Sequence, residues 1–405
     1  MQRIEAYIAD AVRTPVGRYG GVLKDVRPDD LSAIVIKAIT GRTGIPAEEI
    51  DDVMWGCANQ AGEDNRNIGR MALLLAGLPH SVPGTTINRL CGSSLDAINQ
   101  SARAIWSGDA TLIIAGGVES MSRAPYAIPK NVSGKALFGN LTAYDTALGW
   151  RFPNPEMESA IGGPLESMGE TAENIFEKYK ISRDKQDEFA FESHKRAVHA
   201  QKACHFHDEI VPVTIPQRKG EPVVVETDEG PRKDTTVEKL AKLPPVFRKN
   251  GTVTAGNSSS MNDGAAGVLM TNEAGLKKYN LTPIAKITSN GVAGVDPRYM
   301  GIGPVPATKF ALKKAGIKLE SIELIELNEA FAVQSLAVMQ ELGLEHERTN
   351  VNGGAIALGH PLGCSGARIM TTLLYEMKRR KIQYGLTTMC IGVGQGISTI
   401  VERIS

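Results

Sequence analysis

The chain contains the stretch AITGRTGIPAEEIDDVMWGC at residues 38–57 and a second version of it, ALKKAGIKLESIELIELNE, at residues 311–329. Gly44 of the first copy aligns with Gly316 of the second. Each copy predicts a helix that ends at this glycine, then a short polar turn, then a strand with apolar residues. Such a repeat predicts a chain built of two similar halves.

The duplication extends beyond the two copies. In each half a turn of small residues follows, opens a helix and leads to another strand, at residues 88–117 and 353–396. Alternating strands and helices predict mostly parallel sheets covered by helices, with ligands beyond the carboxyl ends of the strands. We therefore expect both halves to direct their turns into one cleft.

The two halves are separated by an insertion at residues 121–250 with a different character. Residues 124–163 are rich in Gly and Pro and carry aromatic residues without a helical period, so we expect this loop to take part in assembly. Ser167 and Glu170 fit a capping box, and Ser182 can cap a second helix. The insertion is therefore predicted to combine an irregular loop with helices.

Composition excludes several classes of protein. The 405 residues include 45 Lys+Arg and 45 Asp+Glu, so no global positive field exists to hold a nucleic acid or an anionic membrane. The apolar run at residues 111–118 is far shorter than the roughly 20 residues of a membrane span, and the acidic first residues do not resemble a signal peptide. We expect a cytoplasmic protein. Five scattered cysteines without a CxxC spacing predict a reactive thiol rather than disulfides or zinc.

Cys91 is the first candidate for such a thiol. It follows the run Thr85-Thr86-Ile87 and precedes a helical pattern, so it is predicted to lie at a strand-to-helix turn. Amides at the start of a helix would stabilise a thiolate and lower the pKa of Cys91 below the usual value of about 8.5. Cys91 is thus a candidate nucleophile, and the alternative is a small residue buried in a tight turn.

The second half offers His360, Cys390 and Asn328. His360 lies in a glycine-rich turn before a helix predicted at residues 367–377, nearly where Cys91 lies in the first half. A neutral imidazole there could accept the thiol proton or donate to an oxyanion. Cys390 ends a predicted strand, and Asn328 follows the strand of the second copy, where an amide could hold a water or an oxyanion.

Two patterns suggest other sites and are rejected. The glycines of residues 392–396 precede a strand, whereas dinucleotide phosphates need a helix N-terminus. His199, Cys204, His205 and His207 are close in sequence but lack a spacing that converges metal ligands. No metal site is predicted.

Six motifs occur in order along the chain: NRLCGSS at 88–94, GGVESMS at 116–122, GTVTAGNSSSMNDGAA at 251–266, NEAF at 328–331, GGAIALGHPLGCSGAR at 353–368 and CIGVGQG at 390–396. With these motifs the chain resembles the thiolases, the acetyl-CoA acyltransferases, from end to end. The resemblance implies an α/β fold of five layers, αβαβα, duplicated and with an inserted loop domain. The implied division is residues 1–120 with 251–280 as the N-terminal half, 121–250 as the inserted loop domain for CoA binding and oligomer contacts, and 281–405 as the C-terminal half.

The resemblance also implies roles for the candidate residues. Cys91 would accept the acyl group, and His360 would activate the Cys91 thiol. Cys390 would exchange a proton with the acetyl-CoA carbon. Asn328 would hold a water that completes one oxyanion hole with His360, and the amides of Cys91 and Gly392 would form another. The implied activity is reversible, CoA-dependent thiolytic cleavage of a 3-ketoacyl-CoA through an acyl-cysteine, in ping-pong order.

Coenzyme A is then expected as a co-substrate, with no permanently bound cofactor. The resemblance places the pantetheine along Met168, Ala255, Ser259 and Phe331, and the nucleotide end near Arg232 and Phe247. It also implies a homotetramer built from dimers.

The acyl substrate and the physiological direction stay open at this stage. Residues 13–21, 56–67 and 149–155 look most similar to the 3-oxoadipyl-CoA thiolases of aromatic-compound breakdown. Arg66 and Arg151 are candidates to bind a terminal carboxylate, with solvated charges as the alternative.

Other activities remain as alternatives. A general 3-ketoacyl-CoA thiolase of fatty acid metabolism is a near alternative, and a biosynthetic acetoacetyl-CoA thiolase is disfavoured because Ser167 stands where that type commonly has histidine. A decarboxylating ketoacyl synthase would need two active-site histidines. A silent acyl-CoA binder would not need Cys91, His360 and Cys390.

Overall fold

The structure is a computed structural model that describes residues 4–130 and 140–404. The first half contains β1 (Tyr7–Arg13), β2 (Gly17–Arg18), α1 (Pro28–Thr43), β3 (Asp52–Gly56), α2 (Ile68–Leu75), β4 (Gly84–Ile87), α3 (Ser93–Ser107) and β5 (Leu112–Ser120). The insertion contains β6 (Tyr126–Ala127), β7 (Tyr144–Asp145), α4 (Met157–Ile161), α5 (Met168–Tyr179), α6 (Arg183–Lys202), β8 (Val213–Ile215), β9 (Val223–Val225) and α7 (Val237–Ala241). The remainder contains β10 (Asn262–Thr271), α8 (Glu273–Lys278), β11 (Ala285–Gly294), α9 (Pro304–Ala315), β12 (Leu324–Leu327), α10 (Ala332–Leu342), α11 (Ala355–Leu358), α12 (Leu362–Arg380), β13 (Tyr384–Ile391) and β14 (Gln395–Arg403).

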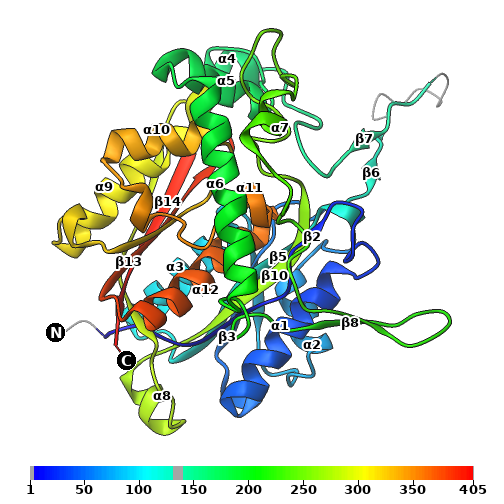
Figure 1. Ribbon diagram of the computed structural model, residues 1–405. Helices are drawn as coiled ribbons and strands as arrows, with labels where there is room; N and C mark the ends of the chain where they lie inside the picture. The colour runs from blue at the N-terminus through cyan, green and yellow to red at the C-terminus, as the bar shows by residue number, and fades with distance from the viewer. Residues whose placement is uncertain (1–3, 131–139, 405) are drawn as a thin grey trace.

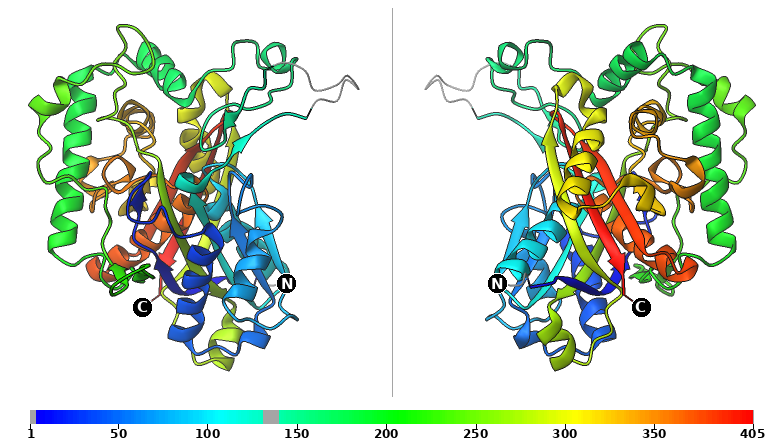
Figure 2. Two further views of the ribbon diagram at one scale, coloured as in Figure 1. Left: turned by 90° about the vertical axis from the view of Figure 1, so that its right-hand side faces the viewer. Right: turned by 90° about the vertical axis from the view of Figure 1, so that its left-hand side faces the viewer.

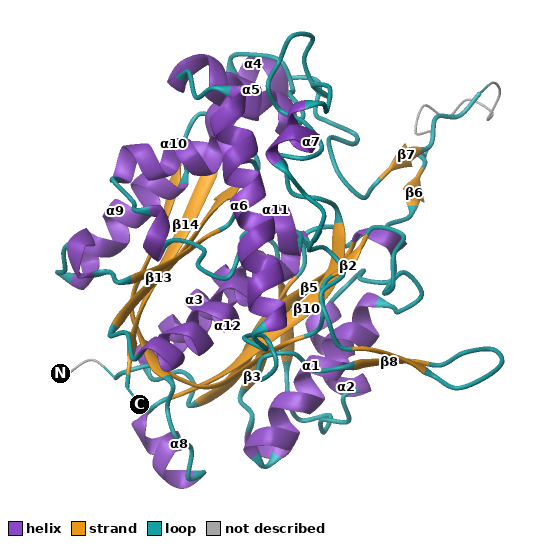
Figure 3. Ribbon diagram, viewed as in Figure 1, coloured by secondary structure: helices purple, strands orange, loops and turns teal. Residues whose placement is uncertain are grey.

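The strands form two sheet regions with helices between and outside them (Figures 1 and 3). They pair in the order β12-β13-β14-β11-β1-β10-β5-β3-β4, with β2 beside β10. The two regions join where Tyr7 and Ile8 of β1 pair with Lys286 and Ala285 of β11. Helices α3 and α12 contact both regions, α1 and α2 cover the outer face of one, and α9 and α10 cover the outer face of the other. The predicted five-layer α/β fold is therefore confirmed.

The duplication is visible element by element. Helix α1 ends at Gly44, which has φ 65°, and α9 ends at Gly316, which has φ 69°. Each glycine is followed by a short 3-10 turn and then by β3 or β12. A left-handed C-cap favours glycine because a Cβ is strained there, so both copies keep the residue that ends the helix.

The prediction of mostly parallel sheets is wrong. Strand β3 is parallel to β4 and β5, and β12 is parallel to β13, but the pairs β1/β10, β5/β10, β11/β14 and β13/β14 are antiparallel. The insertion leaves β5 and returns to β10 at the same end, because Ser120 pairs with Asp263. A short turn likewise joins β13 to β14, so the chain direction must reverse in both places.

The central core surrounds α3 and α12. The predicted apolar face of α3, namely Leu95, Ile98, Ala102 and Ile105, is completely buried. Ile369 and Leu373 of α12 belong to the same cluster. Each buried Leu or Ile contributes about 1.5–3 kcal/mol by leaving water. The middle layer is therefore a rigid support for whatever lies at the helix N-termini.

The insertion has two parts, as predicted. Ser167 accepts a hydrogen bond from the Glu170 amide at the start of α5, and Ser182 accepts one from the Lys185 amide at the start of α6. The segment with β6 and β7 extends away from the layered body (Figures 1 and 2). In the described ranges, we find no helix that combines the length and the apolar character needed to span a membrane.

Candidate active site

Cys91 lies at the turn between β4 and α3, as predicted. The Asn88 Oδ1 accepts a hydrogen bond of 2.9 Å from the Leu90 amide, and Ser93 Oγ accepts one of 3.0 Å from the Arg89 amide. Leu90 has a positive φ of 46°, which makes the turn sharp enough to place Cys91 just before the helix. The side chain of Cys91 is partly exposed.

The Cys91 thiol differs from its predicted state. Burial of the sulfur raises the pKa of Cys91 to about 11, although hydrogen bonds from the amides of Gly392 and Cys91 lower it. The prediction that the helix N-terminus lowers this pKa is wrong, because the lost solvation of the charged form outweighs the amides. With this pKa, Cys91 is a neutral thiol near pH 7, and a nucleophilic role would require a base.

His360 is buried, and burial lowers its pKa to about 3, so the imidazole is neutral near pH 7. Its Nδ1 lies 2.6 Å from Ser365 Oγ, and the Ser365 hydroxyl donates to the Pro361 carbonyl at 2.8 Å. Because the hydroxyl proton is used there, Nδ1 must carry a proton and donate to Ser365. This tautomer makes Nε2 the basic nitrogen of the ring, which can accept a proton.

Asn328 lies beside that nitrogen. Its Nδ2 is 3.4 Å from His360 Nε2, and its backbone amide donates to the Thr388 carbonyl of β13 at 3.0 Å. The buried Asn328 Oδ1 has no hydrogen-bond partner among residues 4–130 and 140–404. The unpaired oxygen can accept a hydrogen bond from a water or a substrate group.

Cys390 is buried near the end of β13, next to Cys91. Burial, and the negative charge that Cys91 carries when it ionises, raise the pKa of Cys390 well above its usual value. A thiol with a raised pKa holds its proton until a strong base, such as a carbanion, is present. Cys91 of the first half thus lies near Cys390 of the second, and His360 and Asn328 of the second half form a neighbouring pair.

Close backbone packing holds the two halves together here. A Cβ placed on Gly366 of α12 would lie 2.4 Å from the backbone nitrogen of Leu95, so the start of α12 touches α3 directly. The Ala367 amide also donates to Ser94 Oγ at 2.9 Å. These contacts are not encoded by sequence spacing, and they set the distance between the Cys91 and His360 turns.

Helix α12 begins at Leu362, earlier than the predicted start at residue 367. The amide of Gly363 in its first turn is paired with Glu119 of β5 at 2.8 Å. Unpaired amides at a helix start need acceptors, and here a residue distant in sequence supplies one. The local pattern could not reveal this acceptor.

Comparison with known proteins agrees with this arrangement. Residues 6–274 match the family model of the thiolase N-terminal domain, and residues 281–403 match that of the thiolase C-terminal domain. This chain belongs to the thiolase family. It is therefore an acyltransferase that catalyses CoA-dependent thiolytic cleavage of a 3-ketoacyl-CoA to acetyl-CoA and a shortened acyl-CoA.

Individual thiolases are similar along their whole length. A beta-ketoadipyl-CoA thiolase of Acinetobacter baylyi is 55% identical over 403 residues, covering 98% of this chain and 99% of that one. A 3-oxoadipyl-CoA/3-oxo-5,6-dehydrosuberyl-CoA thiolase of Escherichia coli K12 is 54% identical, covering 99% of this chain and 100% of that one. The structure of human mitochondrial 3-ketoacyl-CoA thiolase in complex with CoA superimposes with a TM-score of 0.92 at 42% identity, covering 99% and 98% of the two chains.

Five of the residues predicted to bind CoA lie on neighbouring segments of this thiolase. Met168 begins α5, and its sulfur would lie 3.5 Å from a Cβ placed on Gly392. The rings of Phe247 and Phe331 meet edge to face with centroids 6.3 Å apart. The Ser259 amide donates to the carbonyl of Ala330, next to Phe331, at 3.0 Å, and the exposed Ala255 precedes Ser259 on the same segment.

Arg232 is the sixth residue predicted to bind CoA, and it lines a surface pocket that contains none of the other five. Its backbone amide donates to His194 Nδ1 at 3.2 Å. The pocket is lined by Phe191, His194, Lys195, Val198, His199, Lys202, Arg232, Lys233 and Thr235. This basic lining suits an anionic group.

His199, Cys204, His205 and His207, which are close in sequence, form no group of metal-capable donors among residues 4–130 and 140–404. His205 Nδ1 contacts Asn352 Oδ1 at 3.0 Å, and the rings of His199 and His205 meet edge to face. In the part of the chain that the structure describes, one set of three metal-capable donors lies within 4.8 Å, formed by Cys57, Asp64 and Glu119. Their carboxylates already accept backbone N–H groups, so the cluster is satisfied by the protein itself.

Proposed function

We propose that this thiolase cleaves 3-oxoadipyl-CoA with CoA, giving acetyl-CoA and succinyl-CoA. Two proximities support the chemistry: Asn328 Nδ2 lies 3.4 Å from His360 Nε2, and Cys91 is close enough to Cys390 to raise the pKa of that thiol. The acyl substrate is supported by the full-length similarity to thiolases that carry this substrate in their names.

The first step is the attack on the ketone. His360 Nε2 accepts the Cys91 proton as the sulfur bonds to the 3-keto carbon. The amides of Cys91 and Gly392 then donate to the oxyanion that forms on the 3-keto oxygen, whereas His360 and a water held by Asn328 donate to the thioester oxygen, which becomes negative in the next step. A neutral base beside a neutral thiol fits this transfer, because no charge has to be buried before substrate binds.

The second step breaks the carbon-carbon bond. The electrons of the bond pass to the departing acetyl-CoA carbon, which takes a proton from Cys390. A second CoA then attacks the acyl-cysteine, and its thiol proton returns to the protein. The pathway is ping-pong because acetyl-CoA leaves before the second CoA reacts.

A small surface hollow beside the Gly392 turn contains the arginine that we assign to the proposed acyl group. It is lined by Trp150, Ile161, Pro164, Glu166, Met168, Thr171, Pro297, Arg298 and Val393. Arg298 places a guanidinium there, although it also pairs with Asp296 at 3.2 Å. Of the arginines predicted for this role, Arg151 donates to Asn59 and to the Thr146 carbonyl, and Arg66 is exposed. We assign the terminal carboxylate to Arg298.

The test compares 3-oxoadipyl-CoA with 3-oxohexanoyl-CoA, which has the same chain length without the carboxylate. We expect kcat/KM to favour 3-oxoadipyl-CoA by about 10-fold to 100-fold, the range of one charge-assisted hydrogen bond. Arg298→Gln should remove most of this preference and leave turnover of acetoacetyl-CoA nearly unchanged. Equal kcat/KM values for the two six-carbon substrates would contradict the proposed substrate.

Arg232 is proposed to bind a phosphate of CoA in the basic pocket. A guanidinium keeps its charge and offers several donors, so Arg232→Ala should raise the apparent KM for CoA about tenfold and weaken its salt dependence. The chemical step should change little. A truncated pantetheine thioester serves as the control substrate, and an equal loss with it would show that Arg232 does not read the nucleotide.

We also propose that the protein assembles as a homotetramer, with the β6–β7 segment as a contact. Tyr126 is 73% exposed and Leu141 is 60% exposed on this projecting segment. Part of the predicted assembly loop, residues 131–139, lies outside the described residues. Apolar side chains so exposed favour a protein partner, and the sedimentation mass of the intact chain tests the proposal. The cytoplasmic location stays a prediction from the sequence.

A further inference from the structure

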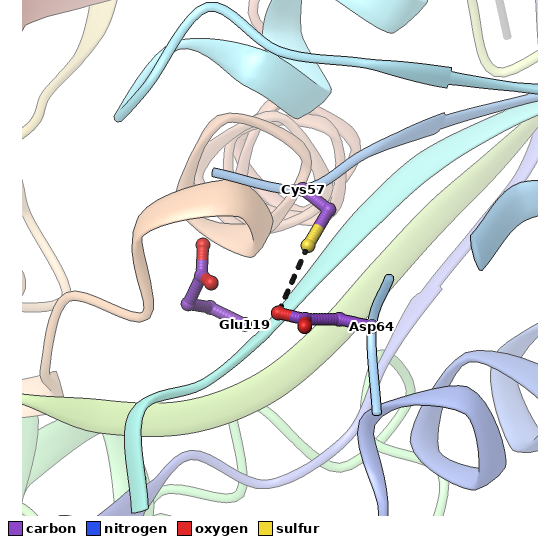
Figure 4. A group of neighbouring side chains, drawn as sticks. All are labelled: Cys57, Asp64 and Glu119. Atoms are coloured by element: carbon purple, nitrogen blue, oxygen red, sulfur yellow. Dashed lines mark hydrogen bonds between the residues drawn. The ribbon is translucent and has the colours of Figure 1, made fainter. Parts of the chain in front are cut away.

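Glu119 is a buried carboxylate that no step of the proposed mechanism uses. It is the penultimate residue of β5, is 1% exposed and lies next to Cys57 and Asp64 (Figure 4). The carboxylate of Glu119 accepts three backbone hydrogen bonds: Oε2 accepts from Gly363 at 2.8 Å and from Ala58 at 3.1 Å, and Oε1 accepts from Asn59 at 3.2 Å. The amides come from two segments that are far apart in the sequence.

One of these segments supports the nucleophile. The Ala58 carbonyl accepts a hydrogen bond of 2.9 Å from Asn88 Nδ2. The Oδ1 of the same Asn88 accepts the Leu90 amide at 2.9 Å. Glu119 is thus connected through Ala58 and Asn88 to the residue immediately before Cys91.

The other segment supports the base. Gly363 lies in the first turn of α12, which also contains Ser365. Ser365 holds His360 through the 2.6 Å contact with Nδ1. The backbone is close as well, because a Cβ on Gly117 of β5 would lie 2.3 Å from the Gly363 carbonyl. Glu119 is thus connected through Gly363 to the ring that accepts the thiol proton.

We propose that Glu119 is a positioning residue that holds the Cys91 turn and the His360 turn at the spacing needed for proton transfer. The proposal rests on the roles proposed above for Cys91 and His360. One carboxylate oxygen shared by the Ala58 and Gly363 amides suits this function, since moving either segment breaks a bond to the same atom. Glutamine at this position would present an NH₂ group to an amide N–H in at least one of the three contacts.

The charge of Glu119 and its hydrogen bonds have opposite effects on the reactivity of Cys91. Its negative charge contributes to the raised pKa of Cys91. Removal of the charge should therefore make the thiolate of Cys91 form at lower pH. Loss of the hydrogen bonds should nevertheless slow the enzymatic acylation. A general loss of structure would not be expected to slow the acylation while lowering the pH at which the Cys91 thiolate forms, so the two measurements together identify a positioning role.

The experiment measures acetylation of Cys91 by acetyl-CoA in a single turnover, detected by intact mass. Glu119→Gln should slow this step about a hundredfold, the usual cost of a small misplacement of reacting groups, with KM for acetyl-CoA changed less than about twofold. Alkylation of Cys91 by iodoacetamide should persist in Glu119→Gln, with its midpoint moved to lower pH.

Asp64→Asn is the matched control. Asp64 is a second buried carboxylate of the same cluster, but it accepts amides only from Gln60 and Gly62 of its own loop. Among residues 4–130 and 140–404 its hydrogen bonds are to Cys57, Gln60 and Gly62 and none reaches α12, so Asp64→Asn should acetylate Cys91 at close to the wild-type rate. If Glu119→Gln does not fold, Glu119→Asp replaces it, because the shorter side chain cannot reach both segments and should slow acetylation in the same way.

Three results would overturn the proposal: wild-type acetylation rates in the Glu119 variant, an equal loss in Asp64→Asn, or a parallel loss of iodoacetamide reactivity. Failure of the proposed function looks different. In that case the wild-type protein itself would carry no acetyl group on Cys91.

Discussion

Cys91→Ala is expected to leave no label on the protein after incubation with radiolabelled acetyl-CoA and to abolish turnover. Cys390, the second thiol of the candidate site, is a poor acceptor because it is buried and its raised pKa disfavours a thiolate. His360 and the oxyanion donors remain in Cys91→Ala, but they have no nucleophile to activate. The measurement is protein-bound radioactivity after gel filtration, together with thiolysis in a spectrophotometric assay.

Cys204→Ala provides the control for Cys91→Ala. Cys204 is an exposed free thiol of the insertion, so any nonspecific acylation would be lost with it and the active-site label would remain. Label retained in Cys91→Ala at the wild-type stoichiometry would show that another residue accepts the acyl group.

Cys390→Ala is expected to separate the two half-reactions. Acetylation of Cys91 should persist in part, since the thiol, His360 and the amide of Gly392 remain. Exchange of the acetyl-CoA methyl protons with solvent, and carbon-carbon cleavage, should fall by about a hundredfold to ten-thousandfold, the usual range of general acid/base help. Exchange is followed by mass spectrometry or NMR in deuterated water.

Cys364→Ala is the matched control for Cys390→Ala. Cys364 is also buried, and burial raises its pKa to about 12, but it lies within α12 rather than at the end of a strand facing Cys91. Its replacement should leave methyl-proton exchange near the wild-type rate. Full exchange in Cys390→Ala would overturn the assignment of Cys390 as the acid/base.

Much of the architecture was predictable because residues close together in the sequence determine it. The glycine that ends each copy of the repeat and the two serine caps of the insertion act within a few residues of themselves. The apolar face of α3 has helical spacing, so its burial follows from the pattern. The strand directions did not follow, because they depend on where the insertion rejoins the sheet.

The candidate site shows the same division. The positions of Cys91 and Asn328 after their strands were predictable from strand-to-turn boundaries. Ser365 and Glu119 stand inside the quoted motifs, but nothing in their spacing indicates that one orients His360 and the other joins two segments. The pKa of Cys91 was predicted in the wrong direction, because the helix start is local whereas the burial comes from the other half of the chain.

The sequence alone determined the duplicated α/β fold, the thiolase family and which residues carry reactive groups, since these depend on periodicity, caps and motifs along the chain. The tertiary structure decided the unprotonated state of His360, the neutral state of Cys91 and the link through Glu119. These properties depend on solvent exclusion and on hydrogen bonds between distant segments, such as the one between Gly363 and Glu119, which are 244 residues apart. Desolvation and long-range hydrogen bonding exist only once the two halves have packed together.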